Sequence, residues 1–333
     1  MSIPVVAFFN NKGGVGKTSM VYHLAWMFSD CGLRVIAADL DPQGNLTAGF
    51  LDEDRLEELI TPDNGHSMTV FGAIQPLKDG TGDISDPYVE IISDRLGLIL
   101  GDMALSTFED DLSEVWPKCL AGDPRAFRIV SAFWRLVQRA GERHRADVIL
   151  VDLGPNLGAI NRAALIGSDF VVISLGPDLF SLQGLVNLGP ALRNWRDGWQ
   201  KRLQETTPLG LPLPAGGIQP IGYMVLRHSI RLDRPVKAFE RWMASMPSTY
   251  AESVLQTMAP QGITIDMDPN CIAKLKDYRS LMSLAKEARK PMFFLKPADG
   301  ALGAHTYAVT DTYNDFKSVA VKIAAKAKIK NLS

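Results

Sequence analysis

"FFNNKGGVGKTSM", residues 8–20, decides how this chain folds and what it binds. Its glycines, lysine and hydroxyl residue are those of a phosphate loop, whose general pattern is GxxxxGK[ST]. That pattern asks for a glycine five residues before Gly16, but Asn11 stands there and Lys12 follows it. The loop therefore contains two lysines, Lys12 and Lys17, where an ordinary phosphate loop needs only one.

The segments around the loop alternate between buried strands and helices. "IPVVAFF" precedes it as a short apolar strand, "KTSMVYHLAWMFSDCG" has helical spacing, and "LRVIAADLD" is a second strand. The alternation resumes at 146–154, 168–176 and 217–226. It predicts an α/β fold of the P-loop NTPase type, with a mostly parallel twisted sheet and helices on both faces. We expect one domain over 1–333, with an irregular insertion around 51–95 and a lysine-rich C-terminal helix at 311–330.

Composition limits the class of protein. Apolar residues make up 46% and charged residues 22% of the chain, as in ordinary globular proteins. No run approaches the roughly 20 apolar residues that span a membrane, and the first residues have no basic stretch of a signal peptide. The three cysteines have no metal-binding spacing, which favours a reducing compartment.

The glycines of the loop allow backbone N–H groups to close around phosphate oxygens. Lys17 would reach the β- and γ-phosphates, and the Thr18 hydroxyl would ligate Mg²⁺. The helix that follows adds the positive end of its dipole. The predicted nucleotide-binding residues are Lys12, Gly13, Gly14, Val15, Gly16, Lys17, Thr18 and Ser19.

Three acids end two of the predicted strands. Asp152 closes the apolar run "VILVD", as the Walker B acid of a nucleotide site does, and could hold Mg²⁺ directly or through water. Asp39 and Asp41 close the second strand, and one of them could orient the attacking water. A lone aspartate at such a place is usually a helix cap or turn residue. Three of them beside a phosphate loop favour a site for Mg²⁺ and hydrolysis.

These segments resemble the ParA family of deviant Walker ATPases, which also contains the MinD-type proteins. The resemblance rests on "NNKGGVGKTSMVYHLAWMF", "RVIAADLDPQGNLTAG", "ADVILVDLGPNLGAINRAAL" and, less specifically, "LGLILGDMALSTFEDDL" and "FSLQGLVNL". It covers about residues 3–50 and 95–195 well and 217–330 loosely. It implies an ATPase that binds ATP and Mg²⁺ and forms a homodimer with ATP at the interface.

The resemblance also implies a role for each matched residue. Lys12 corresponds to the signature lysine, which reaches the phosphates of the partner subunit's ATP, and Lys17 to the ordinary phosphate lysine. Asp41 corresponds to the acid that positions water, so the expected catalytic residues are Lys12, Lys17 and Asp41. Thr18, Asp39 and Asp152 are the expected metal residues.

Family members of the ParA type bind DNA without sequence preference and act with a ParB-like or other adaptor protein. Residues 191–333 contain 21 lysines and arginines against 12 acids, whereas residues 1–190 contain 14 against 25. A basic half is typical of a polyanion partner, although scattered surface charge explains it equally well. The candidate DNA contacts are Arg193, which lies near a family arginine, and Arg227, Arg231, Lys237 and Arg241. The expected location is the cytoplasm, on the nucleoid.

Two departures from the family pattern limit the resemblance. "DLGPN" has Gly154 where the family has a proline, and the family's C-terminal "PR" segment is not clear, so base recognition is not assigned. The chain has extra length around 51–90 and 196–216, so the resemblance does not indicate which cargo or partner the protein would have.

Three other functions compete with this one. A MinD-type ATPase would use the C-terminal helix as an amphipathic membrane anchor, with Phe316, Val319, Val321, Ile323 and Ile329 as its apolar residues. The alanines in that helix favour docking on the core instead. A reductase that carries an iron–sulfur cluster would need more cysteines than this chain has in a suitable place. A nucleotide-gated regulatory switch with little turnover stays open.

Overall fold

The centre of the fold is a sheet in which β1 (Val5–Phe9) lies between β5 (Val148–Asp152) and β6 (Phe170–Leu175). In this computed structural model, the described residues are 2–60, 66–205, 210–226, 236–278, 280–301, 303–330 and 332, with the backbone alone at 205, 236–239 and 304. The sheet has the strand order β3-β4-β2-β5-β1-β6-β7-β8. Its other strands are β2 (Val35–Asp39), β3 (Glu90–Ser93), β4 (Leu96–Ile99), β7 (Gln219–Leu226) and β8 (Cys271–Leu275).

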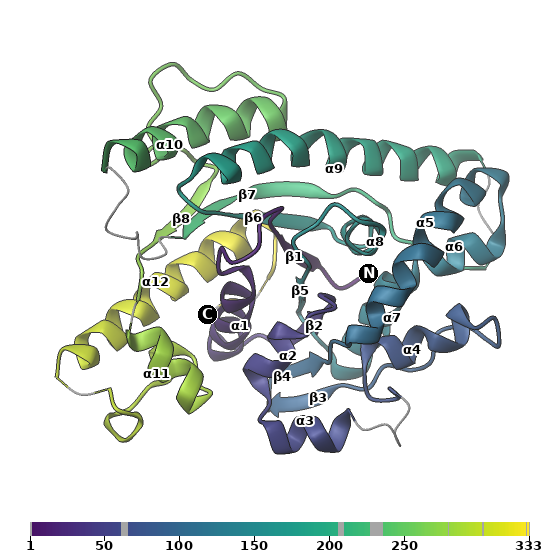
Figure 1. Ribbon diagram of the computed structural model, residues 1–333, viewed down its shortest axis with the longest axis horizontal. Helices are drawn as coiled ribbons and strands as arrows, with labels where there is room; N and C mark the ends of the chain where they lie inside the picture. The colour runs from purple at the N-terminus through teal and green to yellow at the C-terminus, as the bar shows by residue number, and fades with distance from the viewer. Residues whose placement is uncertain are drawn as a thin grey trace.

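All neighbouring strands are parallel except the edge pair β3 and β4. Helices cover both faces, as parallel strands require. They are α1 (Lys17–Asp30), α2 (Asn45–Phe50), α3 (Glu53–Leu59), α4 (Val70–Lys78), α5 (Phe108–Lys118), α6 (Pro124–Val130), α7 (Ala132–His144), α8 (Ala159–Ile166), α9 (Leu179–Glu205), α10 (Val236–Thr249), α11 (Ser280–Ala288) and α12 (Ala304–Lys326). Figure 1 shows α9 as a long helix that lies beside β6 and β7.

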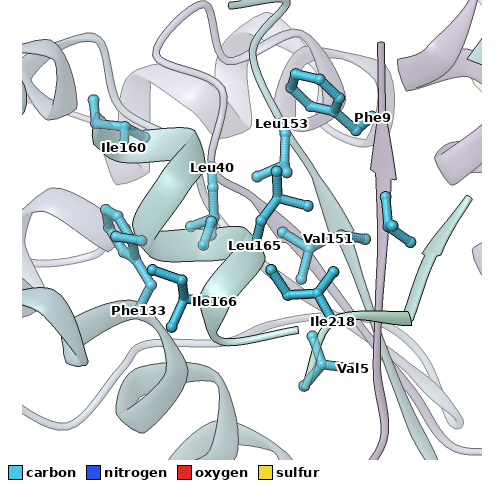
Figure 2. Packing of buried hydrophobic residues seen from close by; sticks show 14 of the residues in the cluster. Val5, Phe9, Leu40, Phe133, Val151, Leu153, Ile160, Leu165, Ile166 and Ile218 are labelled. Atoms are coloured by element: carbon cyan, nitrogen blue, oxygen red, sulfur yellow. The ribbon is translucent and has the colours of Figure 1, made fainter. Parts of the chain in front are cut away.

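The alternation of side chains along β1 divides the core between the two faces. Val6 and Phe8 join the cluster formed with α1 and α12, whereas Val5 and Phe9 join the cluster formed with α7, α8 and α9. Figure 2 shows the second cluster, where Val5 and Phe9 lie with Leu165 of α8. Because every residue of β1 is buried, the loop that follows the strand starts from a fixed point.

The predicted fold class is confirmed, but several elements differ from their predictions. The segment 51–95 contains α3, α4 and β3 and is more regular than expected. The C-terminal helix begins at Ala304 and ends at Lys326, so it starts earlier than the predicted residue 311. Neither α7 nor β8 was among the predicted elements. The single-domain organisation stays a prediction.

Candidate nucleotide site

The carboxyl ends of β1, β2, β5 and β6 meet at one edge of the sheet, which is where parallel α/β folds bind their ligands. The phosphate loop follows β1 and leads directly into α1. Gly14 has φ 76° and Gly16 has φ 86°, a left-handed conformation that glycine adopts without steric cost. The first N–H groups of α1 therefore point out of the loop, where they can bind an anion.

Lys17 and Thr18 converge on one buried carboxylate. Lys17 Nζ forms an ion pair with Asp152 Oδ1, and the Thr18 hydroxyl donates to Asp152 Oδ2 at 2.7 Å. Asp152 is completely buried at the end of β5. Burial raises the pKa of Asp152, and Lys17 and Thr18 oppose that rise by stabilising the charged form. The lysine and hydroxyl predicted to bind phosphate and metal thus lie beside the predicted Walker B acid.

Asp39 lies directly beside Asp152 because the two residues are paired in the register of β2 and β5. Its Oδ2 accepts hydrogen bonds from the backbone N–H and the hydroxyl of Thr47, both at 2.8 Å. Burial first, and then the neighbouring charge of Asp152, raises the pKa of Asp39 to about 7. A carboxyl group in this position holds a proton near neutral pH unless a cation replaces it.

Asp41 is the third acid, and the loop after β5 lies against it. A Cβ at Gly154 would lie 3.4 Å from Asp41 Oδ1, at van der Waals contact, so the glycine of "DLGPN" lies directly against this carboxylate. Glu109 of α5 holds the other end of that loop, because it accepts from Ala159 N at 2.5 Å and from Ile160 N at 2.9 Å. Glu109 was not among the predicted site residues. It lies in the acidic first turn of α5, and the sequence there does not indicate that its partner is the loop after β5.

The donors at this edge fit Mg²⁺. They are hard oxygens, the Thr18 hydroxyl and the carboxylates of Asp39 and Asp152, and the acids outnumber the buried lysine that faces them. Among the described residues, no group of three His, Cys, Asp or Glu side chains forms a complete metal site. In Mg²⁺ sites at nucleotides, phosphates and water usually complete the coordination shell.

Lys12 does not join these residues. Its side chain is 36% exposed at the rim of the site, and its Nζ donates to Asp178 Oδ2 at 2.7 Å. Its backbone N–H donates to Asn10 Oδ1 at 2.6 Å, and Asn10 Nδ2 donates to Ser174 O of β6. Neither Asn10 nor Asp178 could be identified from the sequence pattern, because their partners depend on β1 and β6 being neighbours. An aspartate before a predicted helix signals an N-cap, but not a lysine partner.

A cavity of about 80 Å³ lies beside the phosphate loop and also was not foreseen. The ends of β7 and β8 and the first turn of α1 form its walls. Its lining residues are Gly16, Ser19, Met20, Leu226, Leu275, Lys276, Asp277, Tyr278, Met282, Met292 and Phe316. A larger cavity of about 570 Å³, between α7 and residues 210–212, contains no residue of the phosphate loop.

His23 connects the phosphate-loop helix to this same region. It is buried, its Nδ1 bonds Ser19 O at 2.7 Å, and its Nε2 accepts from Met292 N at 3.2 Å. Burial lowers the pKa of His23 to about 4, so the ring is neutral at physiological pH. The first turns of α1 are thereby fixed to the C-terminal segment that lines the small cavity.

The candidate DNA contacts are not gathered at one described place. Arg193 donates to Ser253 O at 2.7 Å, so its guanidinium stabilises the π-helical segment Tyr250–Leu255. Arg241 is exposed, with its guanidinium carbon 4.6 Å from the centre of the Trp242 ring. Arg227 and Arg231 lie outside the described residues, as does the side chain of Lys237.

The apolar side of α12 faces the protein interior. Phe316, Val319 and Ile323 are at most 1% exposed and belong to the core cluster shared with α1, whereas Val321 is 47% exposed. Three of the five residues that a membrane anchor would need are therefore already buried. Across the described part of the chain, no helix has the length and apolarity to cross a bilayer.

Comparison with known proteins gives matches over the region that builds the site. The family model AAA_31, described as an AAA domain, matches residues 3–205, more than half of the chain. Protein IncC of Escherichia coli is 31% identical over 191 residues, covering 56% of this chain and 45% of that protein. Chromosome partitioning protein ParA of Caulobacter vibrioides is 28% identical over 200 residues, covering 60% of this chain and 66% of that protein. The chain thus spans less than half of IncC.

Among solved structures, protein DIP2308 from Corynebacterium diphtheriae is similar over nearly its whole length. The TM-score is 0.66, and the match covers 98% of this chain and 99% of that one at 24% identity. At this identity the likeness shows the shared fold.

Proposed function

Because this chain belongs to the ParA-type P-loop ATPases of the AAA_31 family, we propose that it binds ATP with Mg²⁺, joins a second copy of itself around the nucleotide, and hydrolyses ATP to separate the two. The position of Lys12 carries the proposal. Lys17 already faces the metal-binding acids of its own subunit, whereas Lys12 lies half-exposed at the rim. A cation at that place can reach phosphate oxygens of a nucleotide held by a facing subunit.

The surface around Lys12 supports the same arrangement. Leu179 is 41% exposed and Phe180 65% exposed at the start of α9, and Lys12 Nζ lies 5.7 Å from the centre of the Phe180 ring. Exposed apolar side chains beside an active site are typical of a surface that another molecule covers. A second subunit placed there would bury Phe180 and bring its own Lys12 to this site.

In the proposed site each residue has a separate task. Lys17 and the N–H groups of the loop hold the β- and γ-phosphates, while Thr18, Asp152 and Asp39 hold Mg²⁺. Mg²⁺ supplies charge neutralisation at the phosphates. Asp41 accepts a hydrogen bond from the attacking water and orients it, and Lys12 of the facing subunit stabilises the negative charge that develops on the γ-phosphate.

We further propose that the ATP dimer binds DNA without sequence preference and positions a plasmid, chromosome or other cargo through a ParB-like adaptor. One of the similar proteins supports the positioning role, since it is named for chromosome partitioning and shares the matched region. The basic composition of residues 191–333 supplies the charge for such binding. The protein would then be cytoplasmic and associated with the nucleoid. The burial of Phe316, Val319 and Ile323 favours this function over membrane anchoring by α12.

Replacing Lys12 and Lys17 one at a time tests the proposal. Lys17→Ala should weaken nucleotide binding roughly 10-fold or more, because it removes the phosphate contact of the same subunit. Lys12→Ala should bind a fluorescent ATP analogue as the parent does but should not dimerise. Nucleotide titration and sedimentation velocity with a slowly hydrolysed analogue give the two readouts. Normal dimerisation of Lys12→Ala would refute the role of Lys12 across the interface.

A further inference from the structure

Asp178 is the residue that the proposed function leaves without a role. It lies at the end of β6, beside the start of the phosphate loop, because β1 and β6 are adjacent. Its Oδ1 accepts from Ser181 N at 3.1 Å and thus caps α9, while its Oδ2 accepts from Lys12 Nζ at 2.7 Å. One carboxylate therefore ties Lys12 to a helix of the same subunit.

The surroundings keep this carboxylate in place. A Cβ at Gly176 would lie 2.8 Å from Asp178 Oδ2, so any larger residue would displace the oxygen that Lys12 contacts. Asp178 has 13% of its side chain exposed, whereas Lys12 has 36%. The acceptor is thus held by the fold, and the lysine is the partner that can leave.

We propose that Asp178 is a positioning residue that holds Lys12 within its own subunit and thereby weakens the ATP-dependent association of two subunits. The inference rests on the proposed function, in which Lys12 must reach the nucleotide of the facing subunit. The inference takes Lys12 to leave Asp178 when its side chain extends toward those phosphates. Only subunits in which Lys12 is released are ready to associate. The apparent affinity between subunits is therefore lowered in proportion to the fraction of each subunit that is in this state.

The size of the effect follows from the exposure of the pair. Partly exposed ion pairs shift an equilibrium by roughly 1.5- to 5-fold. A dimer contains two copies of the Lys12–Asp178 pair, and both must open, so the factors multiply to roughly 2- to 25-fold. Association would then require a protein concentration that is higher by that factor.

Asp178→Asn tests the inference, because asparagine keeps the oxygen that caps α9 and removes the charge that holds Lys12. The chain offers a matched control in Lys290 and Asp299. This pair also spans 2.7 Å, its side chains are 44% and 13% exposed, and Asp299 also accepts a backbone N–H, that of Lys296. Asp299→Asn therefore removes an equivalent ion pair away from the phosphate loop.

Two measurements are made on the parent, Asp178→Asn and Asp299→Asn. Acylation of the Lys12 amine, followed by mass spectrometry without nucleotide, should be faster in Asp178→Asn alone. The dimer dissociation constant with a slowly hydrolysed ATP analogue should fall roughly 2- to 25-fold in Asp178→Asn alone, with the nucleotide affinity of the monomer unchanged. If the parent dimerises and the dissociation constant of Asp178→Asn is equal to or higher than that of the parent, the inference is overturned but the proposed function is not. No dimer in any of the three proteins would overturn the proposed function, and the inference with it.

Discussion

Asp41 is the residue on which turnover depends in the proposed mechanism. Its carboxylate accepts the Gln43 N–H at 3.0 Å and is only 5% exposed, so its position is fixed by the turn after β2. Asp41→Ala should leave nucleotide binding intact and remove the group that orients water. We expect phosphate release to fall at least about 100-fold while the ATP dimer accumulates. Phosphate release at the parental rate would contradict this assignment.

Asp39 makes the stability of the nucleotide-free protein depend on pH. Its pKa is about 7 in the folded chain and near 3.8 when unfolded. Between these values the folded chain keeps a proton that the unfolded chain has lost, so stability falls as pH rises through this interval and levels off above pH 7. The neighbouring charges of Asp152 and Asp41 contribute to the effect.

Asp39→Asn should remove this slope. Without Mg²⁺ or nucleotide, we expect the variant to melt roughly 3 to 6 °C above the parent at pH 8, with a smaller difference at pH 5. Thermal melts across pH 5–8 give the comparison. Glu57→Gln, at an exposed position in α3, is the control and should leave the profile of the parent unchanged. A parallel profile for Asp39→Asn would show that this carboxyl group does not have the raised pKa from which the slope is predicted.

The residues that follow buried strands could be placed from the sequence, because parallel strands end at a common edge. Lys17, Thr18, Asp39 and Asp152 lie together for this reason. The contact between Lys12 and Asp178 could not be placed, because it depends on the order of the strands. The pattern shows that strands are parallel but not which of them are neighbours.

At the scale of elements, two of the three glycines in α9 differ in what surrounds them. A Cβ at Gly189 would lie 1.9 Å from the carbonyl oxygen of Ser253, in the π-helical segment Tyr250–Leu255. A Cβ at Gly184 would meet only the Cβ of Asn11, at 3.7 Å. Gly189 therefore allows α9 and the π-helical segment to approach closely, whereas Gly184 lies at no such close contact.

Gly189→Ala should lower the melting temperature by roughly 2 to 6 °C, because backbone must move to admit the methyl group. Gly184→Ala is the matched control in the same helix, and it should be neutral or stabilising by up to about 1 kcal/mol, since alanine favours the helix. Differential scanning calorimetry of both variants measures the contrast. Equal melting temperatures would mean that α9 and the π-helical segment are not tightly packed.

Elements with a uniform apolar run were predicted well, and elements with mixed character were not. β5 reads as "VILVD" and is buried throughout. β8 reads as "CIAKL" at the sheet edge, and its burial alternates with exposure, so the short run carries little signal. α7 buries Arg135, whose guanidinium forms two hydrogen bonds of 2.8 Å with Asp83. The apolar residues of α7 do repeat at helical spacing, but the sequence does not show that Arg135 among them is buried against Asp83.

Across the whole molecule, the uneven distribution of charge predicts how DNA binding should respond to salt. If the basic half contacts phosphates, affinity with ATP should fall roughly 10- to 1000-fold between 50 and 200 mM salt. Arg241→Ala should reduce the salt slope by about 1 per contact and leave the melting temperature unchanged, because Arg241 is exposed. Fluorescence anisotropy with duplexes of two unrelated sequences measures both the affinity at each salt concentration and the salt slope. Salt-independent binding would exclude a phosphate interface.

The central position of β1 has a consequence for how the protein is made. β1 pairs with residues 149–152 and 170–173, so the strand that precedes the phosphate loop does not have both neighbours until more than half of the chain has left the ribosome. The first motif to be translated is therefore among the last to become functional. A ribosome-bound chain that stops before β6 should not retain ATP, whereas one that extends past α9 should begin to do so.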